Sequence, residues 1–390
     1  MTNVALLMLM AAFAAVGAEF PAGQIIDAVK CANDASQSYA LYVPSHYSPD
    51  RTWPVIFAFD PAARGRIPVE RFEAAAEQYG YLVAGSNNSR NGSADSGAAA
   101  QAMAADVGSR FAIDAKRIYL AGMSGGARVA MGLALGSPDI AGVLASSAGY
   151  PDSKPRKTVP FAVFGTAGTE DFNYVEMRLV DRALTTPHRL VIFDGGHTLP
   201  PDAVALEAIE WMELQAMTAR RRDRDDALID RLLAKRQAAI AAAADPVATV
   251  HLLDALVADF RGLRDVSAAA ARADDLRKRK DVKSALSRER TDDDAEARLM
   301  NEILDLESGL SDDSRRAQNL LQLRARLSAC SRAANAAADS PERRQARRVL
   351  RGITSGAAER VKDADYLKMI SEFRLPSPGR GNEAKGAMGE

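Results

Sequence analysis

The 390-residue sequence contains only two cysteines, Cys31 and Cys330. Two thiols exclude a zinc site built from paired CxxC motifs and a dense disulfide framework, so the fold must be stabilised mainly by its hydrophobic core. The two residues lie far apart in the sequence. Both a single disulfide, formed in an oxidising compartment, and two separate buried thiols are consistent with this pattern.

The sequence also lacks an excess of charge of either sign. Fifty Lys and Arg residues nearly balance 51 Asp and Glu residues, which leaves a net charge of -1. Such a chain has no overall field that would attract nucleic acid or an anionic membrane surface, and we expect no nucleic-acid partner. Arginine-rich segments such as residues 341–351 are interleaved with acidic neighbours, a pattern typical of solvated helix faces.

A long hydrophobic run, residues 4–16, lies at the N-terminus, and small residues suited to cleavage follow it up to Ala18. This arrangement is typical of an export signal, although no Lys or Arg precedes the run, and a buried N-terminal helix is the alternative. The run is too short to cross a bilayer as a permanent anchor. We therefore expect residues 1–18 to be a signal peptide, no integral membrane anchor, and a secreted or periplasmic protein.

Residues 19–222 alternate short β-branched and aromatic segments with longer alanine-rich segments. Several of the short segments are apolar on both faces, as are strands of a parallel sheet that is covered on both sides. Alternating strands and helices predict a doubly wound, mostly parallel sheet, in which ligands bind at the carboxyl ends of the strands. The sequence predicts strands at 38–43, 54–60, 81–87, 117–123, 142–148, 160–166 and 188–194, and helices at 69–80 and 205–217.

The composition changes after residue 222 to one rich in Ala, Arg, Asp and Leu, with few aromatic residues. Apolar residues recur there at helical spacing, and two segments begin with a capping residue before proline, Asp245-Pro246 and Ser340-Pro341. We therefore predict an all-α C-terminal domain over residues 223–374. Residues 375–390 have too little apolar content to pack and are predicted to form a disordered tail.

A GxSxG sequence at residues 122–126 lies where a predicted strand ends and a helix begins. A nucleophile elbow requires this strand-turn-helix setting, because its serine, here Ser124, adopts a strained backbone and the flanking glycines let strand and helix approach closely. The N–H of Gly125 would then point toward a developing oxyanion. A phosphate-binding turn is the alternative, but the sequence has neither GxGxxG nor a Walker lysine.

A nucleophilic serine needs a base, and the sequence contains four histidines. His197 lies on a Gly-Gly loop after the last predicted strand of the α/β region, whereas the others lie in an early loop, at a strand start and in the helical half (His46, His188, His251). The base needs an orienting carboxylate, and Asp171 follows the preceding strand. The adjacent Glu170 remains an alternative, while Asp194 is too close to His197 along the chain.

The order Ser124, Asp171, His197 is that of α/β-hydrolases. With the segments GMSGG, FGTAGTED and DGGHTLP in this order, residues 38–217 resemble a minimal α/β-hydrolase. The resemblance is to extracellular serine esterases, a group that includes polyhydroxyalkanoate depolymerases and feruloyl esterases. It covers about half of the chain and implies cleavage of carboxylic esters through an acyl-enzyme, with no metal and no organic cofactor. The appended helical domain is not part of this resemblance.

The sequence of one loop differs from the sequence usual in this family. Such esterases usually carry His-Gly after the strand that supplies the second oxyanion donor, whereas this chain carries Asp60-Pro61. Proline has no N–H, so the second donor would have to come from Ala62 or from nearby backbone. Because losing one donor typically costs about 10²- to 10³-fold in rate, this loop bears directly on activity.

Two further segments bear on the substrate. The polar loop at residues 86–93 follows a strand at the same sheet edge, and its side chains either bind substrate hydroxyls or a carboxylate or stabilise the loop's own turns. The candidates are Asn87, Asn88, Arg90 and Asn91. Residues 153–158 are too few to form a helical lid, which favours an open pocket and bulky or polymeric esters.

These observations favour an exported serine hydrolase that acts on small-molecule or polymeric esters. Two alternatives stay open. One is a weak or inactive hydrolase-fold protein that works through its helical domain, by binding a protein partner or by self-association. The other is a serine peptidase, since the same nucleophile and base also cleave amides.

Overall fold

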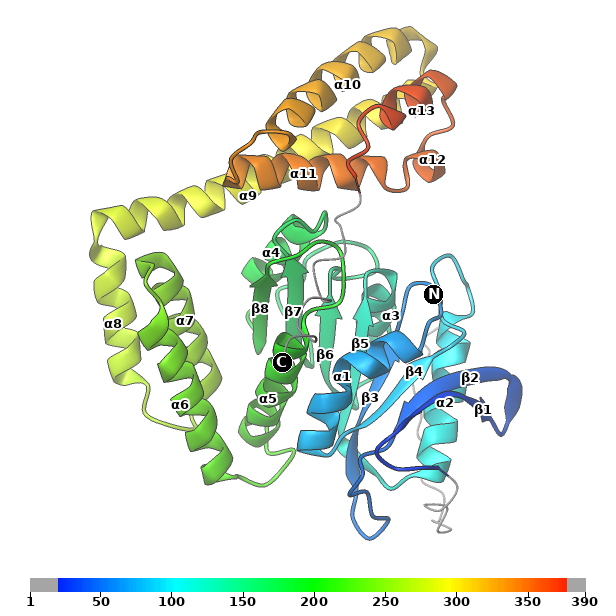
Figure 1. Cartoon of the computed structure of the whole chain (residues 1–390), viewed down its shortest axis with the longest axis vertical. Coiled ribbons are helices and arrows are strands. Elements are labelled where there is room, and N and C mark those ends of the chain that lie inside the picture. Colours follow the sequence, from blue (N-terminus) through cyan, green and yellow to red (C-terminus); the bar gives the residue numbers. More distant parts are fainter. Residues whose placement is uncertain (1–19, 377–390) are drawn as a thin grey trace, which may run out of the picture. The chain divides into compact units, whose positions relative to one another are not determined.

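The structure is a computed structural model that describes residues 20–376 (Figure 1). The predicted signal peptide and residues 377–390 of the predicted tail lie outside the described residues. The chain forms two compact units. Unit 1 includes residues 20–167, Glu176–Phe193 and Thr198–Glu289, whereas unit 2 consists of Gly168–Val175, Asp194–His197 and residues 290–376.

An eight-stranded sheet forms the centre of unit 1, with strand order β1-β2-β4-β3-β5-β6-β7-β8. Strand β2 is antiparallel to both of its neighbours, whereas β4, β3, β5, β6 and β7 are mutually parallel. The predicted doubly wound, mostly parallel sheet and all seven predicted strands are confirmed. The strands are β1 Ile25–Cys31, β2 Asp34–Tyr42, β3 Trp53–Phe59, β4 Leu82–Ser86, β5 Ile113–Met123, β6 Ile140–Ser146, β7 Ala162–Gly168 and β8 His188–Phe193.

Strand β1 was not predicted from the sequence. It lies at the edge of the sheet and pairs only with β2, and much of it faces solvent through charged residues such as Asp27 and Lys30. It therefore lacks the continuous apolar character on which the strand predictions depended.

Helices cover both faces of the sheet. Alternate residues of β3 enter two different apolar clusters: Val55 and Phe57 join one, and Ile56 joins the other. The first cluster includes residues of α2, α3 and α4, and the second includes residues of α1 and α5. These helices are α1 Arg66–Tyr79, α2 Ser96–Arg110, α3 Gly125–Leu135, α4 Tyr174–Ala183 and α5 Asp202–Thr218. Helix α1 ends at Gly80, as predicted, because the chain there takes a left-handed φ of 71°.

Three helices that follow the α/β region also belong to unit 1: α6 Asp226–Ala242, α7 Pro246–Phe260 and α8 Ser267–Lys278. They share an apolar cluster with the end of α5. Helix α7 begins as predicted, with the Asp245 side chain accepting the Ala248 N–H ahead of Pro246. The predicted start of the helical domain at residue 223 therefore marks a change in secondary structure but lies inside unit 1.

A buried ionic network joins these helices to the sheet. Arg189 on β8 pairs with Asp259 on α7 and with Glu207 on α5, and Arg236 on α6 pairs with Glu207 at 2.9 Å. Trp211 Nε1 donates to the Asp259 carboxylate at 2.7 Å. Since buried charges are tolerated only with well-placed partners, this network fixes α6 and α7 against α5 and β8.

Unit 2 is otherwise all helical. Its helices are the later part of α9 (Lys280–Ser308), then α10 Asp313–Ala334, α11 Pro341–Thr354, α12 Ala357–Arg360 and α13 Ala364–Ser371, with a 3-10 turn at Gly309–Ser311. They enclose a core of their own that includes Ile303, Leu323 and Val349. Helix α11 begins as predicted, with Ser340 capping the Arg343 N–H ahead of Pro341. The prediction of an all-α region after the α/β sheet is confirmed.

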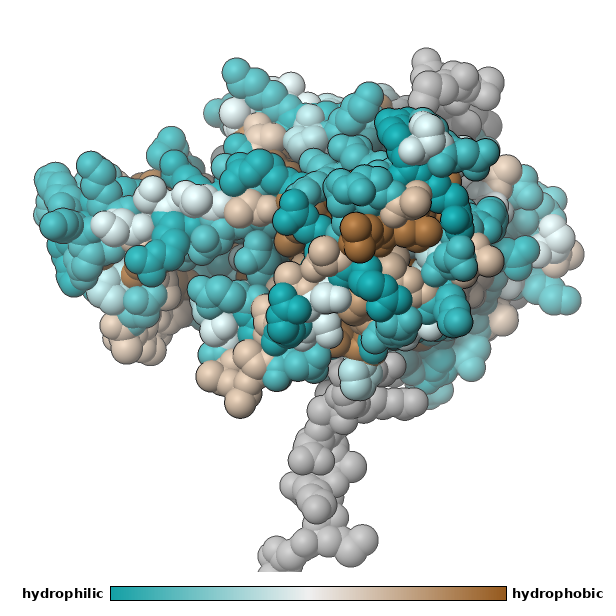
Figure 2. Space-filling view, turned by 90° about the horizontal axis from the view of Figure 1, so that it is seen from above, coloured by the Kyte–Doolittle hydropathy of each residue, from teal (hydrophilic) through white to brown (hydrophobic). Residues whose placement is uncertain are grey.

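The Cys31 and Cys330 thiols are free and buried, which is the second of the two alternatives left open by the sequence. Burial, followed by the nearby Asp106 and Asp34 carboxylates, raises the pKa of the Cys31 thiol to about 11, which keeps it in its unreactive form. No helix between residues 20 and 376 has both the length and the apolar character of a membrane span. The face shown in Figure 2 is covered mainly by hydrophilic side chains with small hydrophobic patches.

The buried ionic network predicts a measurable contribution to the free energy of unfolding. Asp259→Ala removes one of the two carboxylates paired with Arg189 and leaves Trp211 without its acceptor, so we expect a loss of about 3–5 kcal/mol in the free energy of unfolding. Urea unfolding measures the change. The control is Asp275→Ala, which breaks an ion pair with Lys278 whose side chains are 75% and 76% exposed, and should leave the stability unchanged. Equal effects of the two substitutions would contradict this account.

Candidate active site

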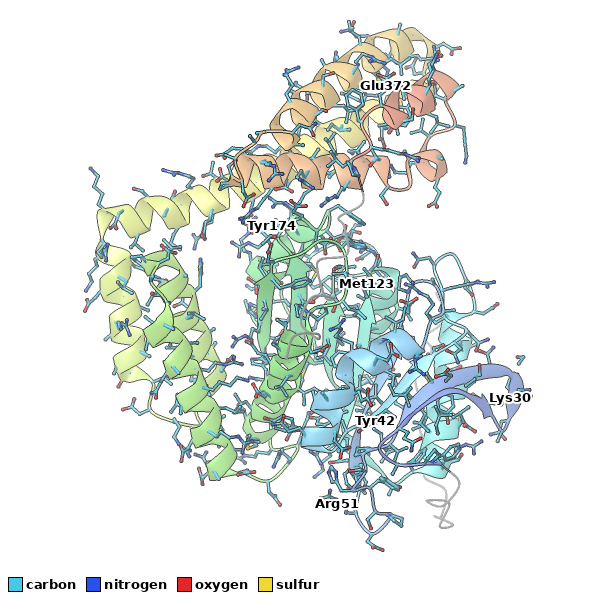
Figure 3. The ribbon with its side chains drawn as sticks, in the orientation of Figure 1. Lys30, Tyr42, Arg51, Met123, Tyr174 and Glu372 are labelled. Carbon is cyan, nitrogen blue, oxygen red and sulfur yellow. The ribbon has the colours of Figure 1, made fainter. Side chains whose placement is uncertain are left out.

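Ser124 lies in the turn between the end of β5 and the start of α3, as a nucleophile elbow requires. Met123, labelled in Figure 3, is the last residue of β5. The Ser124 backbone has φ 55° and ψ -121°, a combination outside the wells that residues with a Cβ ordinarily occupy. Its N–H donates to the Ser146 carbonyl oxygen at 2.8 Å, so the neighbouring strand β6 helps to hold this strained conformation.

The glycines on either side of Ser124 are required by close backbone contacts. A Cβ on Gly122 would lie 2.3 Å from the carbonyl carbon of Gly126, and a Cβ on Gly126 would lie 2.0 Å from the Phe59 carbonyl oxygen. No side chain fits at either position. Strand β5, strand β3 and helix α3 can therefore meet at this turn only because both residues are glycine.

Asp171 and His197 lie on the loops that follow β7 and β8, and the structure brings their side chains together. His197 Nδ1 is 2.8 Å from Asp171 Oδ1. Because a carboxylate only accepts, the proton of this hydrogen bond belongs to Nδ1, which leaves Nε2 as the basic nitrogen. Asp171 is fully buried, and among residues 20–376 its Oδ2 has no hydrogen-bond partner.

The other two acidic residues considered for the orienting role, Glu170 and Asp194, have different partners. Glu170, the open alternative to Asp171, forms ion pairs with Arg347 at 3.1 Å and Arg351 at 2.6 Å. Asp194 Oδ1 accepts a hydrogen bond from the Thr169 hydroxyl at 3.2 Å. Asp171 is thus the carboxylate that orients the imidazole.

The loops that carry Asp171 and His197 also contact each other directly. The Glu170 N–H donates to the Gly195 carbonyl oxygen at 2.8 Å, and a Cβ on Gly168 would lie 2.4 Å from the same oxygen. The Phe172 ring stacks on the His197 imidazole, with ring centroids 3.9 Å apart. The sequence analysis did not identify Phe172. Its position next to Asp171 was the one sequence feature that could have indicated it.

The structure does not support Ala62 as the second oxyanion donor. Its N–H donates to Asp60 Oδ1 at 2.8 Å, and the same oxygen accepts from Arg64 Nε at 2.9 Å. The Asp60 carboxylate is buried and organises its own loop. The donor expected at Ala62 is therefore already engaged.

Two asparagines of the polar loop after β4 stabilise the fold. Asn87 Oδ1 accepts the Gly65 N–H at 3.1 Å, and Asn88 Oδ1 accepts the Ser38 N–H at 2.8 Å. These contacts connect the loop to the start of α1 and to β2. Stabilisation of the loop therefore explains both side chains better than substrate binding does. The Arg90 side chain is exposed.

Asn91 is the loop residue that lies beside the elbow. Its Oδ1 is 1.6 Å and its Nδ2 is 3.1 Å from the point where a Cβ on Gly125 would lie. The side-chain amide of Asn91 therefore fits beside the elbow only because residue 125 is glycine. The Asn91 backbone N–H donates to the Pro61 carbonyl oxygen at 2.9 Å, which fixes the loop independently of its side chain.

No group of three or more His, Cys, Asp or Glu side chains between residues 20 and 376 is arranged to hold a metal ion.

Comparisons with known proteins found similar solved structures only. No protein-family model and no curated protein matches the chain. One similar structure is a feruloyl esterase module from Clostridium thermocellum complexed with sinapinate, with 13% identity, a TM-score of 0.36, and coverage of 48% of this chain and 86% of that chain. An esterase from the archaeon Pyrobaculum calidifontis has 12% identity, a TM-score of 0.38, and coverage of 51% and 87%. A thermostable esterase has 18% identity, a TM-score of 0.37, and coverage of 48% and 61%. The activities in these descriptions are those of the similar proteins.

Proposed function

We propose that the protein is an exported serine hydrolase that cleaves carboxylic esters. The observation that carries this proposal is the backbone of Ser124, with φ 55° and ψ -121° at the carboxyl end of a central strand. Glycine would occupy such a turn without strain, so a serine there points to a function for its hydroxyl. The hydrogen-bonded His197 and Asp171 pair, which follows strands at the same sheet edge, supplies the base that a serine nucleophile needs.

In the proposed reaction, Ser124 Oγ attacks the ester carbonyl carbon while His197 Nε2 accepts the hydroxyl proton. Asp171 stabilises the resulting imidazolium through its hydrogen bond to Nδ1. The alcohol leaves with the proton from Nε2, and water then cleaves the acyl-enzyme by the reverse sequence of proton transfers. The Gly125 N–H, at the N-terminus of α3, stabilises the oxyanion.

For the second oxyanion donor we propose the Asn91 side chain in place of Ala62. The amide lies beside Gly125, whereas the Ala62 N–H is bound to Asp60. The oxygen and nitrogen of an amide are assigned from its surroundings, so either end can face an oxyanion, and the nitrogen would donate.

The substrate is proposed to be a small or polymeric ester that enters an open pocket. Residues 153–158, after β6, form no helix. This short, irregular segment supplies no helical lid of its own, which favours a substrate too large to be enclosed.

The engaged N–H of Ala62 favours one alternative, a hydrolase-fold protein with weak or no activity. Labelling with a fluorophosphonate probe, together with rates on p-nitrophenyl esters and peptide amides, separates the candidates. We expect labelling and ester cleavage in the wild type, no labelling in Ser124→Ala, and slower cleavage of amides. An unlabelled but folded wild type would contradict the proposal and support the inactive alternative, whereas preferred cleavage of amides would make the protein a peptidase.

Asn91→Ala should lower kcat on the same esters by about 10²- to 10³-fold, because one oxyanion donor is lost. The backbone hydrogen bond to Pro61 does not involve the side chain, so the loop should keep its conformation. Ser93→Ala, in the same loop, is the matched control and should retain the wild-type rate. A wild-type kcat in Asn91→Ala would rule out the amide as a donor.

A further inference from the structure

Helix α11 and the loop that carries Asp171 belong to the same compact unit. Unit 2 contains the loops Gly168–Val175 and Asp194–His197 in addition to its helices. One side of α11 contacts four positions of the first loop, namely Thr169, Glu170, Phe172 and Tyr174. The function proposed above assigns no role to these contacts.

Arg348 is the central contact. Its Nη1 donates to the Thr169 carbonyl oxygen at 2.7 Å, and its guanidinium lies 4.2 Å from the centre of the Tyr174 ring. Its Nε donates to the buried Glu296 carboxylate at 2.8 Å, so the guanidinium is itself held in place from α9. The side chain is 10% exposed and contacts the loop on both sides of Asp171.

Two further arginines of α11 hold the residue next to Asp171. Arg347 and Arg351, one helical turn apart, form ion pairs with the two carboxylate oxygens of Glu170. The Arg351 side chain is 13% exposed and that of Glu170 is 23% exposed, so solvent screens this pair less than it screens a surface ion pair.

The fourth contact connects α11 to the His197 imidazole through Phe172. A Cβ on Gly352 would lie 3.4 Å from Phe172 Cβ, which shows that the helix backbone approaches Phe172 closely. Phe172 stacks on His197 at 3.9 Å. Arg347 with Arg351 and Arg348 with Gly352 form two adjacent i, i+4 rows, so one face of α11 makes all four contacts.

We infer that α11 is a positioning element that holds Asp171 and His197 in their hydrogen-bonded arrangement. This inference rests on the proposed function. Loops that carry functional residues are usually mobile unless a rigid element supports them, and a displacement of about 1 Å can cost about 10²-fold in rate. The C-terminal helices are thus part of the hydrolase and act on its base, with Arg351 and Glu170 as positioning residues.

A double-mutant cycle on p-nitrophenyl acetate tests this. In the full chain, Arg351→Ala and Glu170→Ala should each lower kcat by about 10- to 100-fold and change KM by less than about twofold. Because the two side chains act through one contact, the double variant should lose no more than either single variant. Arg324→Ala removes an exposed ion pair with Glu372 in the same unit and should keep the wild-type kcat. Additive losses in the cycle, or an unchanged kcat in both single variants, would overturn the inference.

A second readout needs no substrate and separates this inference from the proposed function. With ¹⁵N-labelled histidine, the four histidines of the chain give few signals, and the Nδ1–H of His197 is identified by its loss in His197→Gln. We expect this proton to exchange with solvent faster in Arg351→Ala and Glu170→Ala than in the wild type and in Arg324→Ala. Equal exchange in all four proteins would refute the positioning role even in an active enzyme. Faster exchange in a protein without esterase activity would support the positioning role while the proposed function fails.

Discussion

The hydrogen bond between the buried Asp171 carboxylate and His197 Nδ1 depends on two loops that leave the sheet after different strands. Asp171 is fully buried, its Oδ1 also accepts the Asn173 N–H at 2.8 Å, and the Phe172 ring stacks on the imidazole. Burial strengthens the hydrogen bond to His197, because the protein interior has a lower dielectric constant than water. The bond also fixes the orientation of the imidazole and leaves Nε2 as the ring nitrogen without a proton.

The large parts of this architecture could be predicted because their signals are local. Strands such as β3 and β6 are apolar on both faces, and the elbow at Ser124 is encoded by glycines that allow no side chain. The pairing of Asp171 with His197 spans 26 residues, yet the order of strands in a parallel sheet places both loops at one edge. Strand β1 was missed because an edge strand that is half exposed has no such signal.

The remaining assignments depended on tertiary partners that no local pattern reveals. The Ala62 N–H is bound by the carboxylate of its own loop, and Asn87 and Asn88 bind segments distant in sequence, whereas Asn91 reaches Gly125. The arginine-rich segment of α11 was expected to be a solvated helix face. Instead, Arg348 is buried, and Arg347 and Arg351 pair with Glu170, because an arginine row has the same sequence whether it faces water or a loop.

An acyl-enzyme on Ser124 is the intermediate that distinguishes the proposed serine hydrolase from every alternative without a serine nucleophile. Intact-protein mass spectrometry after brief mixing with p-nitrophenyl acetate measures it directly, with peptide mapping to locate the added group. We expect one added acetyl group on Ser124 in the wild type and none in Ser124→Ala. A wild type that turns over the ester without acylation of Ser124, or that is acylated elsewhere, would rule out Ser124 as the nucleophile.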